Sequence, residues 1–189
     1  MSTTIIPANS GLLFMKVGLH AGETYQDILN RKMKEHERAG MIFWGYGGGT
    51  CHPTRCVQPF AKIALEQRED IYIVMEEIDS RHPKTEMVAK EFSEDGINWR
   101  PIPKGIEVRG SRYAVVLDEL QEGALDLDLN QYQVGAGPST GKPASAYIAG
   151  RVDKACIVKS SKPGDNEGPV IKKIQHFAKI KSPYAVFTR

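Results

Sequence analysis

The chain has 189 residues, of which 41% are hydrophobic and 25% are charged, and its formal net charge is +2. This composition is typical of a folded globular protein and excludes wholesale disorder. The small net charge does not by itself indicate nucleic-acid binding. No window approaches the ~20 apolar residues of a membrane span, and no stretch resembles a signal peptide. We therefore expect a cytoplasmic protein with no membrane partner.

The first 80 residues carry the pattern of a β-α-β-α-β unit. After a loose tail over residues 1–10, a helix is predicted from Thr24, where Asp27 completes a partial capping box, to a stop at Gly40. A second helix begins either with a single turn at Pro53 or with the main helix near Pro59. Helices that alternate with short apolar strands favour parallel strand pairs. The predicted strands cover 12–19, 41–44 and 71–78.

Strand signals dominate the rest of the chain. Asp95-Gly96 predicts the turn of a hairpin within 91–103. Leucines that alternate with Asp and Asn from Leu125 to Asn130 predict a half-exposed strand. Further strands are expected within 106–120, 147–158 and 170–187. We predict an α+β fold in which the N-terminal β-α-β-α-β unit (11–80) is continuous with a β-rich, mostly antiparallel C-terminal half (84–189), in a single domain of residues 1–189.

A glycine-rich loop over residues 45–55 is the strongest functional signal. It follows an apolar run and includes Trp-Gly-Tyr-Gly-Gly-Gly-Thr-Cys-His-Pro, residues 44–53. Such a loop can direct several backbone N–H groups at one anion, and we expect a positive φ within Gly47–Gly49. The spacing matches neither the Walker nor the dinucleotide-binding pattern. We predict binding of a nucleotide-like or other anionic small molecule by Tyr46 as a stacking face, Gly47, Gly48 and Gly49 as donors, Thr50, and Arg55 as counter-charge.

Cys51 is the candidate nucleophile of a Cys-dependent enzyme. Thiolates form most readily near cations or a helix N-terminus, and His52, Arg55 and a helix start lie close in sequence. We accordingly expect Cys51 to react faster with a thiol alkylator than Cys56 or Cys156. His20, and less directly His52, are the candidate bases. The alternatives are a buried, inert cysteine and a tight loop that binds nothing.

Metal ligation receives little support from the residue spacing. Cys51, His52 and Cys56 could be joined by His20 or Cys156. Paired C-x-x-C or H-x-x-x-H spacing is absent. No metal site is therefore predicted, and the sequence names no cofactor.

Three segments are expected to meet at one edge of the sheet. If the first three strands are parallel, their C-terminal ends lie together, where open α/β sheets bind ligands. That edge would hold His20, the loop from Tyr46 to His52, and the acidic segment from Glu77 to His82. Glu77 is therefore added to the candidate ligand-binding residues. Two later segments, Gly110–Tyr113 and Gly150–Lys154, also place cations beside glycine, and we interpret them as surface ion pairs.

The second functional hypothesis is a non-catalytic binding module, or a small intracellular inhibitor or adaptor. Seven basic and two acidic residues lie between Lys159 and Arg189. Such a basic face could contact nucleic acid or an acidic protein surface. A third hypothesis is a subunit whose glycine loop serves only assembly. The residues of the basic face are Lys172, Lys173, His176, Phe177, Lys179, Lys181 and Tyr184.

Overall fold

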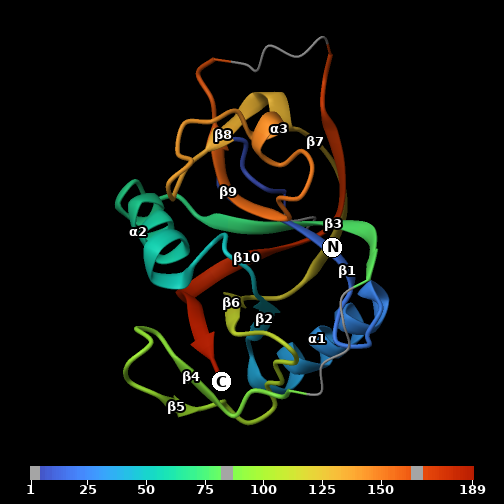
Figure 1. The fold of residues 1–189 in the computed structure, drawn as a ribbon, viewed down its shortest axis with the longest axis vertical. Coiled ribbons are helices and arrows are strands. Elements are labelled where there is room, and N and C mark those ends of the chain that lie inside the picture. The colour runs from blue at the N-terminus through green and yellow to red at the C-terminus, as the bar shows by residue number, and fades with distance from the viewer. Residues whose placement is uncertain (1–4, 82–86, 163–167) are drawn as a thin grey trace.

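The structure is a computed structural model that describes residues 5–81, 87–162 and 168–189. Its centre is a ten-stranded sheet, and seven of its strands follow the order β2-β6-β10-β3-β1-β9-β8. Strands β4 and β7 pair with β10, and β5 pairs with β4. Figure 1 shows β3, β1 and β9 crossing the middle of the molecule, with β4 and β5 at the opposite end from β8 and α3. Among the described residues, no helix is both long enough and apolar enough to cross a membrane.

The N-terminal half has the predicted β-α-β-α-β order. Thr24 caps the first helix with the reciprocal Asp27 contact, and Gly40 ends it in the left-handed conformation at φ 71°. A π-helical turn runs straight into the second helix, so the turn at Pro53 and the main helix with Pro59 in its first turn both exist. The elements are β1 (Gly11–Leu19), α1 (Tyr25–Ala39), β2 (Ile42–Tyr46), η1 (Pro53–Val57), α2 (Gln58–Glu66) and β3 (Ile71–Arg81).

The C-terminal half is β-rich, and its strand pairs are antiparallel. The predicted hairpin is formed by β4 and β5, with Gly96 at φ 78° in the loop between them. Tyr147 lies in a helical turn instead of the predicted strand. The elements are β4 (Glu91–Ser93), β5 (Arg100–Pro101), β6 (Tyr113–Leu117), β7 (Gln121–Asp128), η2 (Leu129–Gln131), β8 (Tyr132–Val134), α3 (Ala144–Tyr147), β9 (Lys154–Lys159) and β10 (Ile171–Thr188).

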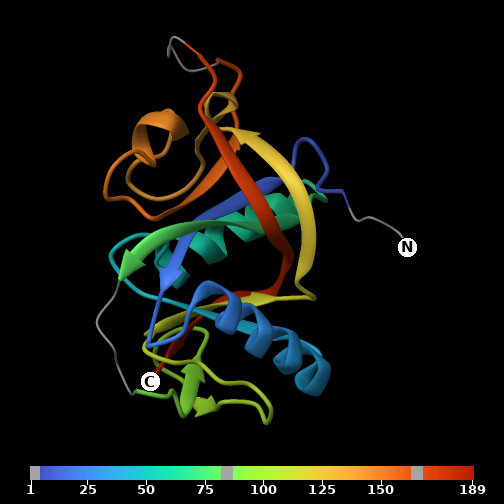
Figure 2. The same ribbon diagram turned by 90° about the vertical axis from the view of Figure 1, so that its right-hand side faces the viewer.

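Strand β10 connects the two ends of the sheet. Its first part pairs with β7 and β3, and its second part pairs with β6 and β4. Figure 2 shows this strand, in red, curving along the molecule toward the C-terminus. One long strand therefore supports both the region under the helices and the β4–β5 hairpin.

Successive side chains of β1 point to opposite faces of the sheet and belong to two different hydrophobic clusters. Leu13 and Met15 join the cluster that includes residues of α1, η1 and α2. Leu12 and Phe14 join the cluster built with β7, β8 and the α3 region. The period of two in a strand explains this division. Both long helices therefore cover the same face of the sheet, and the glycine loop lies on that face.

The position of β2 differs from the expectation of three parallel strands. β1 and β3 are parallel neighbours, from Gly11 opposite Ile71 to Val17 opposite Glu77. β2 instead pairs with β6 in the antiparallel sense, at the end of the strand order. The hydrophobic pattern of a segment predicts that it is a strand but does not predict which strand it pairs with. The partner of β2 is β6, which belongs to the C-terminal half of the chain.

Candidate functional site

The glycine loop leaves the end of β2 and needs glycine at one position. Gly48 has φ +84°, which confirms the expected positive φ within the triplet. A Cβ atom on Gly48 would lie 3.2 Å from Lys154 Nζ, whereas one on Gly47 or Gly49 would meet no atom within 4 Å. Gly48 is therefore required by the backbone, while Gly47 and Gly49 border open space.

Two hydrogen bonds brace this loop. The Tyr46 hydroxyl donates to the carbonyl oxygen of Cys51 at 2.6 Å, and Arg112 donates to the carbonyl oxygen of Gly48 at 2.9 Å. Tyr46 is only 4% exposed, and burial raises the pKa of its hydroxyl. The prediction of an open stacking face at Tyr46 is therefore unsupported, because the side chain is used inside the fold to fix the loop.

On one side of the loop lies a cavity of about 320 Å³, here called the cationic cavity. Its wall combines the end of β1, the start of the glycine loop and the segment around Ser111. Asp153 is the one carboxylate among its described lining residues. The charged and polar side chains used below are Lys16, His20, Arg31, Lys32, Arg109 and Lys154.

Hydrogen bonds hold the cations of the cationic cavity in place. Lys16 donates to the carbonyl oxygen of Ile148 at 2.8 Å, and Lys154 pairs with Asp153 at 2.9 Å. Arg31 pairs with Glu23 at 2.7 Å, and Arg109 pairs with Glu107. Burial, and then the charge of Lys172, lower the pKa of Lys16. Glu76 and Asp153 oppose this lowering.

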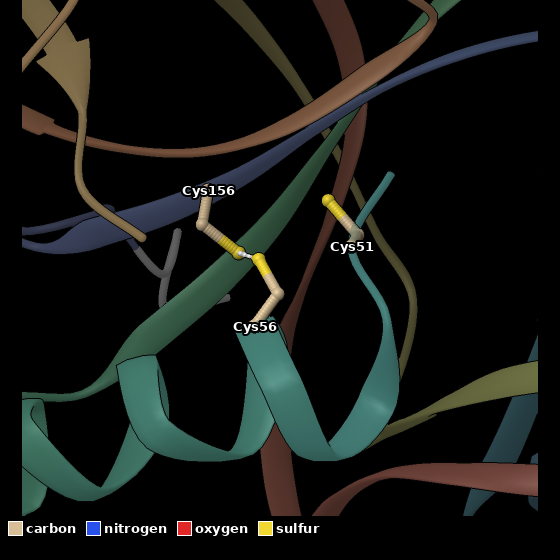
Figure 3. A group of neighbouring side chains, drawn as sticks. All are labelled: Cys51, Cys56 and Cys156. Carbon is tan, nitrogen blue, oxygen red and sulfur yellow. Dashed lines mark hydrogen bonds between the residues drawn. The ribbon is translucent and has the colours of Figure 1, made fainter. Parts of the chain in front are cut away.

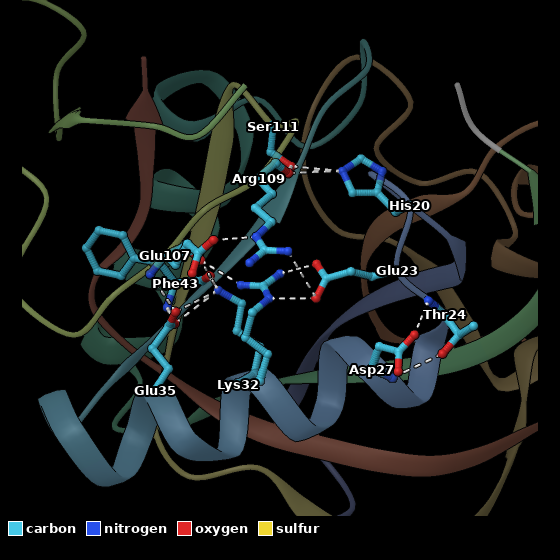
Figure 4. A network of polar contacts seen from close by, with 11 residues as sticks. His20, Glu23, Thr24, Asp27, Lys32, Glu35, Phe43, Glu107, Arg109 and Ser111 are labelled. Atoms are coloured by element: carbon cyan, nitrogen blue, oxygen red, sulfur yellow. Dashed lines mark hydrogen bonds and ion pairs between the residues drawn. The ribbon is translucent and has the colours of Figure 1, made fainter. Parts of the chain in front are cut away.

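His20 lies in the wall of the cationic cavity, together with Tyr46, Gly47 and Gly48. Its Nε2 contacts Ser111 Oγ at 3.3 Å and the carbonyl oxygen of Arg109 at 3.2 Å (Figure 4). The end of β1 and the start of the glycine loop therefore meet, as expected from the sequence.

Glu77 lies elsewhere. It lines a different cavity of about 820 Å³, together with Glu76 and Asp79. Carboxylates repel an anionic ligand, so the structure gives no support to Glu77 as part of the anion site. His82, which was expected at the same edge, lies outside the described residues.

On the other side of the glycine loop is a cavity of about 250 Å³, here called the thiol cavity. Cys51, Cys56 and Cys156 line it, together with Thr50 and Arg55. Gly49 and the buried Lys154 lie in the same wall, and Lys154 also lines the cationic cavity. Cys51 and His20 therefore face separate cavities, and the predicted pairing of this thiol with this base finds no support in the geometry.

His52 has a structural position. Its Nδ1 accepts a hydrogen bond from the backbone N–H of Arg55 at 3.4 Å, which caps η1. Its ring makes edge contacts with Tyr113 and Phe187, at centroid distances of 5.5 and 5.3 Å. Burial, followed by the charges of Arg55 and Arg112, lowers the pKa of His52. These contacts explain the histidine without a catalytic role.

The pKa values of the three thiols are shifted in different directions. Hydrogen bonding with Cys156, and then with Cys51, lowers the pKa of Cys56. The interaction with Cys156 acts to lower the pKa of Cys51, but the hydrogen bond to Cys56 and burial reverse this and raise it. Hydrogen bonds to the other two thiols, and then burial, raise the pKa of Cys156. The structure therefore favours a thiolate at Cys56, not at Cys51.

Alkylation of the reduced, metal-free protein should accordingly modify Cys56 first. The rate at Cys56 should level off at a lower pH than the rates at Cys51 and Cys156, because its lowered pKa makes it a thiolate at lower pH. The rates at Cys51 and Cys156 should be slower and should rise with pH. Mass-spectrometric mapping after brief exposure to iodoacetamide measures all three. Fastest labelling at Cys51 would restore the original prediction.

Two segments of the sequence carry a signal for the cationic cavity. Gly110 and Ser111 lie in its wall, as do Asp153 and Lys154. These belong to the two segments that place cations beside glycine, which we interpreted as surface ion pairs. Lys16, Arg31 and Lys32 had no local signal, because each belongs to an ordinary strand or helix pattern.

No family model matches this chain, and no curated protein or solved structure matches it at a significant level.

Proposed function

We propose that this protein binds an anionic small molecule in the cationic cavity, against Gly47 and Gly48. One observation carries the proposal: five lysine and arginine side chains line a cavity of about 320 Å³ whose described wall holds a single carboxylate. Four of the five are ion-paired with a carboxylate, and Lys16 is the one that forms no ion pair with a described residue. Cations gathered around a recessed space raise the local concentration of anions. The five side chains are Lys16, Arg31, Lys32, Arg109 and Lys154.

The size of the cavity limits the ligand. Small-molecule sites occupy about 300–1,000 Å³, so this cavity suits a compact molecule with one or two phosphate or carboxylate groups. Open space beside Gly47 supports a close approach of the ligand to the backbone. The proposal covers binding and assigns no reaction, since the thiols line the other cavity.

The basic C-terminal face is a weaker candidate for the binding surface. Lys172 pairs with Glu76, Lys173 with Asp126 and Lys179 with Asp70, at 3.3, 3.7 and 2.9 Å. His176 and Phe177 are buried. Ion pairing and burial leave this face with much less free positive charge than its sequence suggests, so nucleic acid and acidic proteins fit it less well.

Binding is tested with inorganic phosphate, pyrophosphate and AMP as probes, by calorimetric titration at low salt. We expect at least one of them to bind, and Lys16→Gln to weaken that binding by about 10-fold or more, since a charged hydrogen bond contributes about 1.5–3 kcal/mol. Gly47→Ala should also weaken binding without loss of stability, because its methyl group enters open space. The matched control is Lys62→Gln, a substitution on the exposed face of α2.

Two results would contradict the proposal. The first is the absence of binding by all three anions to the folded wild-type protein. The second is binding that Lys62→Gln weakens as much as Lys16→Gln does, because that pattern reports general surface charge and not the cavity. A duplex oligonucleotide added as a fourth probe tests the alternative: tight, salt-sensitive binding to it would favour the basic C-terminal face.

A further inference from the structure

Three cysteines from three separate elements meet in the core. Cys51 lies in the glycine loop, Cys56 in η1 and Cys156 in β9. Their sulfur atoms all lie within 4.8 Å of one another, and the Cys56 and Cys156 sulfurs are 3.9 Å apart. Figure 3 shows the three side chains turned into the same space between η1 and the sheet. None of them is in a disulfide.

The spacing of the sulfurs matches a metal site more closely than a disulfide. Zinc bonds to thiolate at about 2.3 Å, which places two sulfurs of a tetrahedral site about 3.8 Å apart. The sulfur atoms of Cys56 and Cys156 are 3.9 Å apart, which is close to this distance. A disulfide requires sulfurs about 2.0 Å apart, so its formation would have to halve that distance within a packed core.

The backbone at Cys51 supports a built site. Cys51 has φ 56°, in the left-handed region that non-glycine residues rarely adopt. Such strain costs roughly 1–3 kcal/mol and is kept where the surrounding structure imposes it. Here the Tyr46 hydroxyl fixes the Cys51 carbonyl at 2.6 Å. The result is that the Cys51 sulfur joins the other two.

Charge and access also suit a divalent ion. Three thiolates around a dication leave one net negative charge, and the cations Lys154 and Arg55 line the same cavity. His52 also lines the thiol cavity, but its Nδ1 accepts a hydrogen bond from the backbone N–H of Arg55 and its ring packs against Tyr113 and Phe187. A fourth ligand would therefore come from the thiol cavity. Three protein ligands with one open position are typical of catalytic rather than structural zinc.

We propose that Cys51, Cys56 and Cys156 form a three-thiolate site for Zn²⁺, with the fourth position open to the thiol cavity. Soft sulfur ligands select zinc and similar thiophilic ions over Mg²⁺ and Ca²⁺. Binding converts those ligands that are still thiols to thiolates and releases their protons to solvent. This site is separate from the proposed anion site, although Lys154 lies in the walls of both cavities.

Titration of the reduced, chelator-treated protein with Co²⁺ tests the proposal, because cobalt reports sulfur ligation through charge-transfer absorption. We expect one ion per chain, displaced by Zn²⁺. Cys51→Ser, Cys56→Ser and Cys156→Ser should each weaken binding by more than about 100-fold, beyond the 10–100-fold cost of changes in the outer shell. Ser139→Ala, in the wall of the same cavity, is the matched control and should bind as wild type. Lys16→Gln should also leave Co²⁺ binding unchanged, which separates this test from that of the anion site.

A measurement on the wild-type chain alone covers variants that fail to fold. Zn²⁺ should protect all three cysteines from iodoacetamide together, and a chelator should remove the protection. The proposal is overturned if Zn²⁺ leaves the labelling unchanged or if Co²⁺ absorption lacks sulfur charge transfer. Isolation of a metal-free protein with a Cys56–Cys156 disulfide would also overturn it.

Discussion

Lys32→Met should lower the free energy of unfolding by about 3–5 kcal/mol, the usual cost of breaking a buried ion pair from one side. Lys32 and Glu35 are 2% and 3% exposed, and their charged atoms lie 3.0 Å apart. Removal of the ammonium leaves the Glu35 carboxylate charged and buried. Urea unfolding monitored by circular dichroism gives the change in free energy.

This ion pair does more than neutralise two charges. Glu35 accepts hydrogen bonds from the backbone N–H groups of Phe43 and Glu107, at 2.9 and 2.8 Å. Lys32 donates to the carbonyl oxygens of the same two residues, at 2.5 and 2.7 Å (Figure 4). The two side chains therefore connect the backbone of β2 to the segment before β6. They supply hydrogen bonds of the kind that a neighbouring strand would make.

A double variant separates this role from ordinary charge pairing. Buried ion pairs elsewhere are often replaced by apolar residues at no cost or with a gain. Lys32→Met with Glu35→Leu should instead remain destabilised, because the backbone groups of Phe43 and Glu107 lose their partners. Full recovery in the double variant would contradict the assignment. Arg100→Ala, which breaks the exposed pair with Glu94, is the control and should cost less than about 1 kcal/mol.

Phe60→Ala should cost a similar amount, about 3–5 kcal/mol, through the cavity that it leaves. The Phe60 ring is wedged between two glycines: a Cβ on Gly11 would lie 2.8 Å from its Cζ, and one on Gly135 would lie 3.0 Å from its Cε2. Phe60 joins α2 to the core next to the turn that carries Cys56. Thermal or urea unfolding measures the loss, and Lys62→Ala on the exposed side of α2 should stay within about 0.5 kcal/mol of wild type.

The two glycines provide a second test of the same contact. Gly11→Ala should destabilise the wild-type protein by about 1–3 kcal/mol, because the added methyl group overpacks the site. In a Phe60→Leu background the same substitution should cost clearly less, since the shorter side chain leaves room. Equal costs in the two backgrounds would show that the aromatic ring is not what requires glycine there.

Local signals in the sequence were sufficient for the elements and for one strained position. The Thr24–Asp27 capping box and Gly40 set the ends of α1, and the triplet around Gly48 contained the predicted positive φ. These signals act within a few residues, so their physical cause is contained in the sequence nearby. The α+β class followed in the same way from the change of pattern after the third strand.

Which side chains meet depends on how the strands pair in three dimensions. Cys56 and Cys156 are 100 residues apart in the chain and 3.9 Å apart at their sulfurs, because β9 pairs with β1 beneath the turn that carries Cys56. Lys16 and Arg109 reach one cavity from β1 and from the segment before β6. The hydrophobic periodicity of the sequence predicts which residues are buried, but it does not predict which strands pair. Local patterns therefore predicted most of the elements and indicated the loop, whereas the strand order places this loop between a cationic cavity and a cluster of thiols.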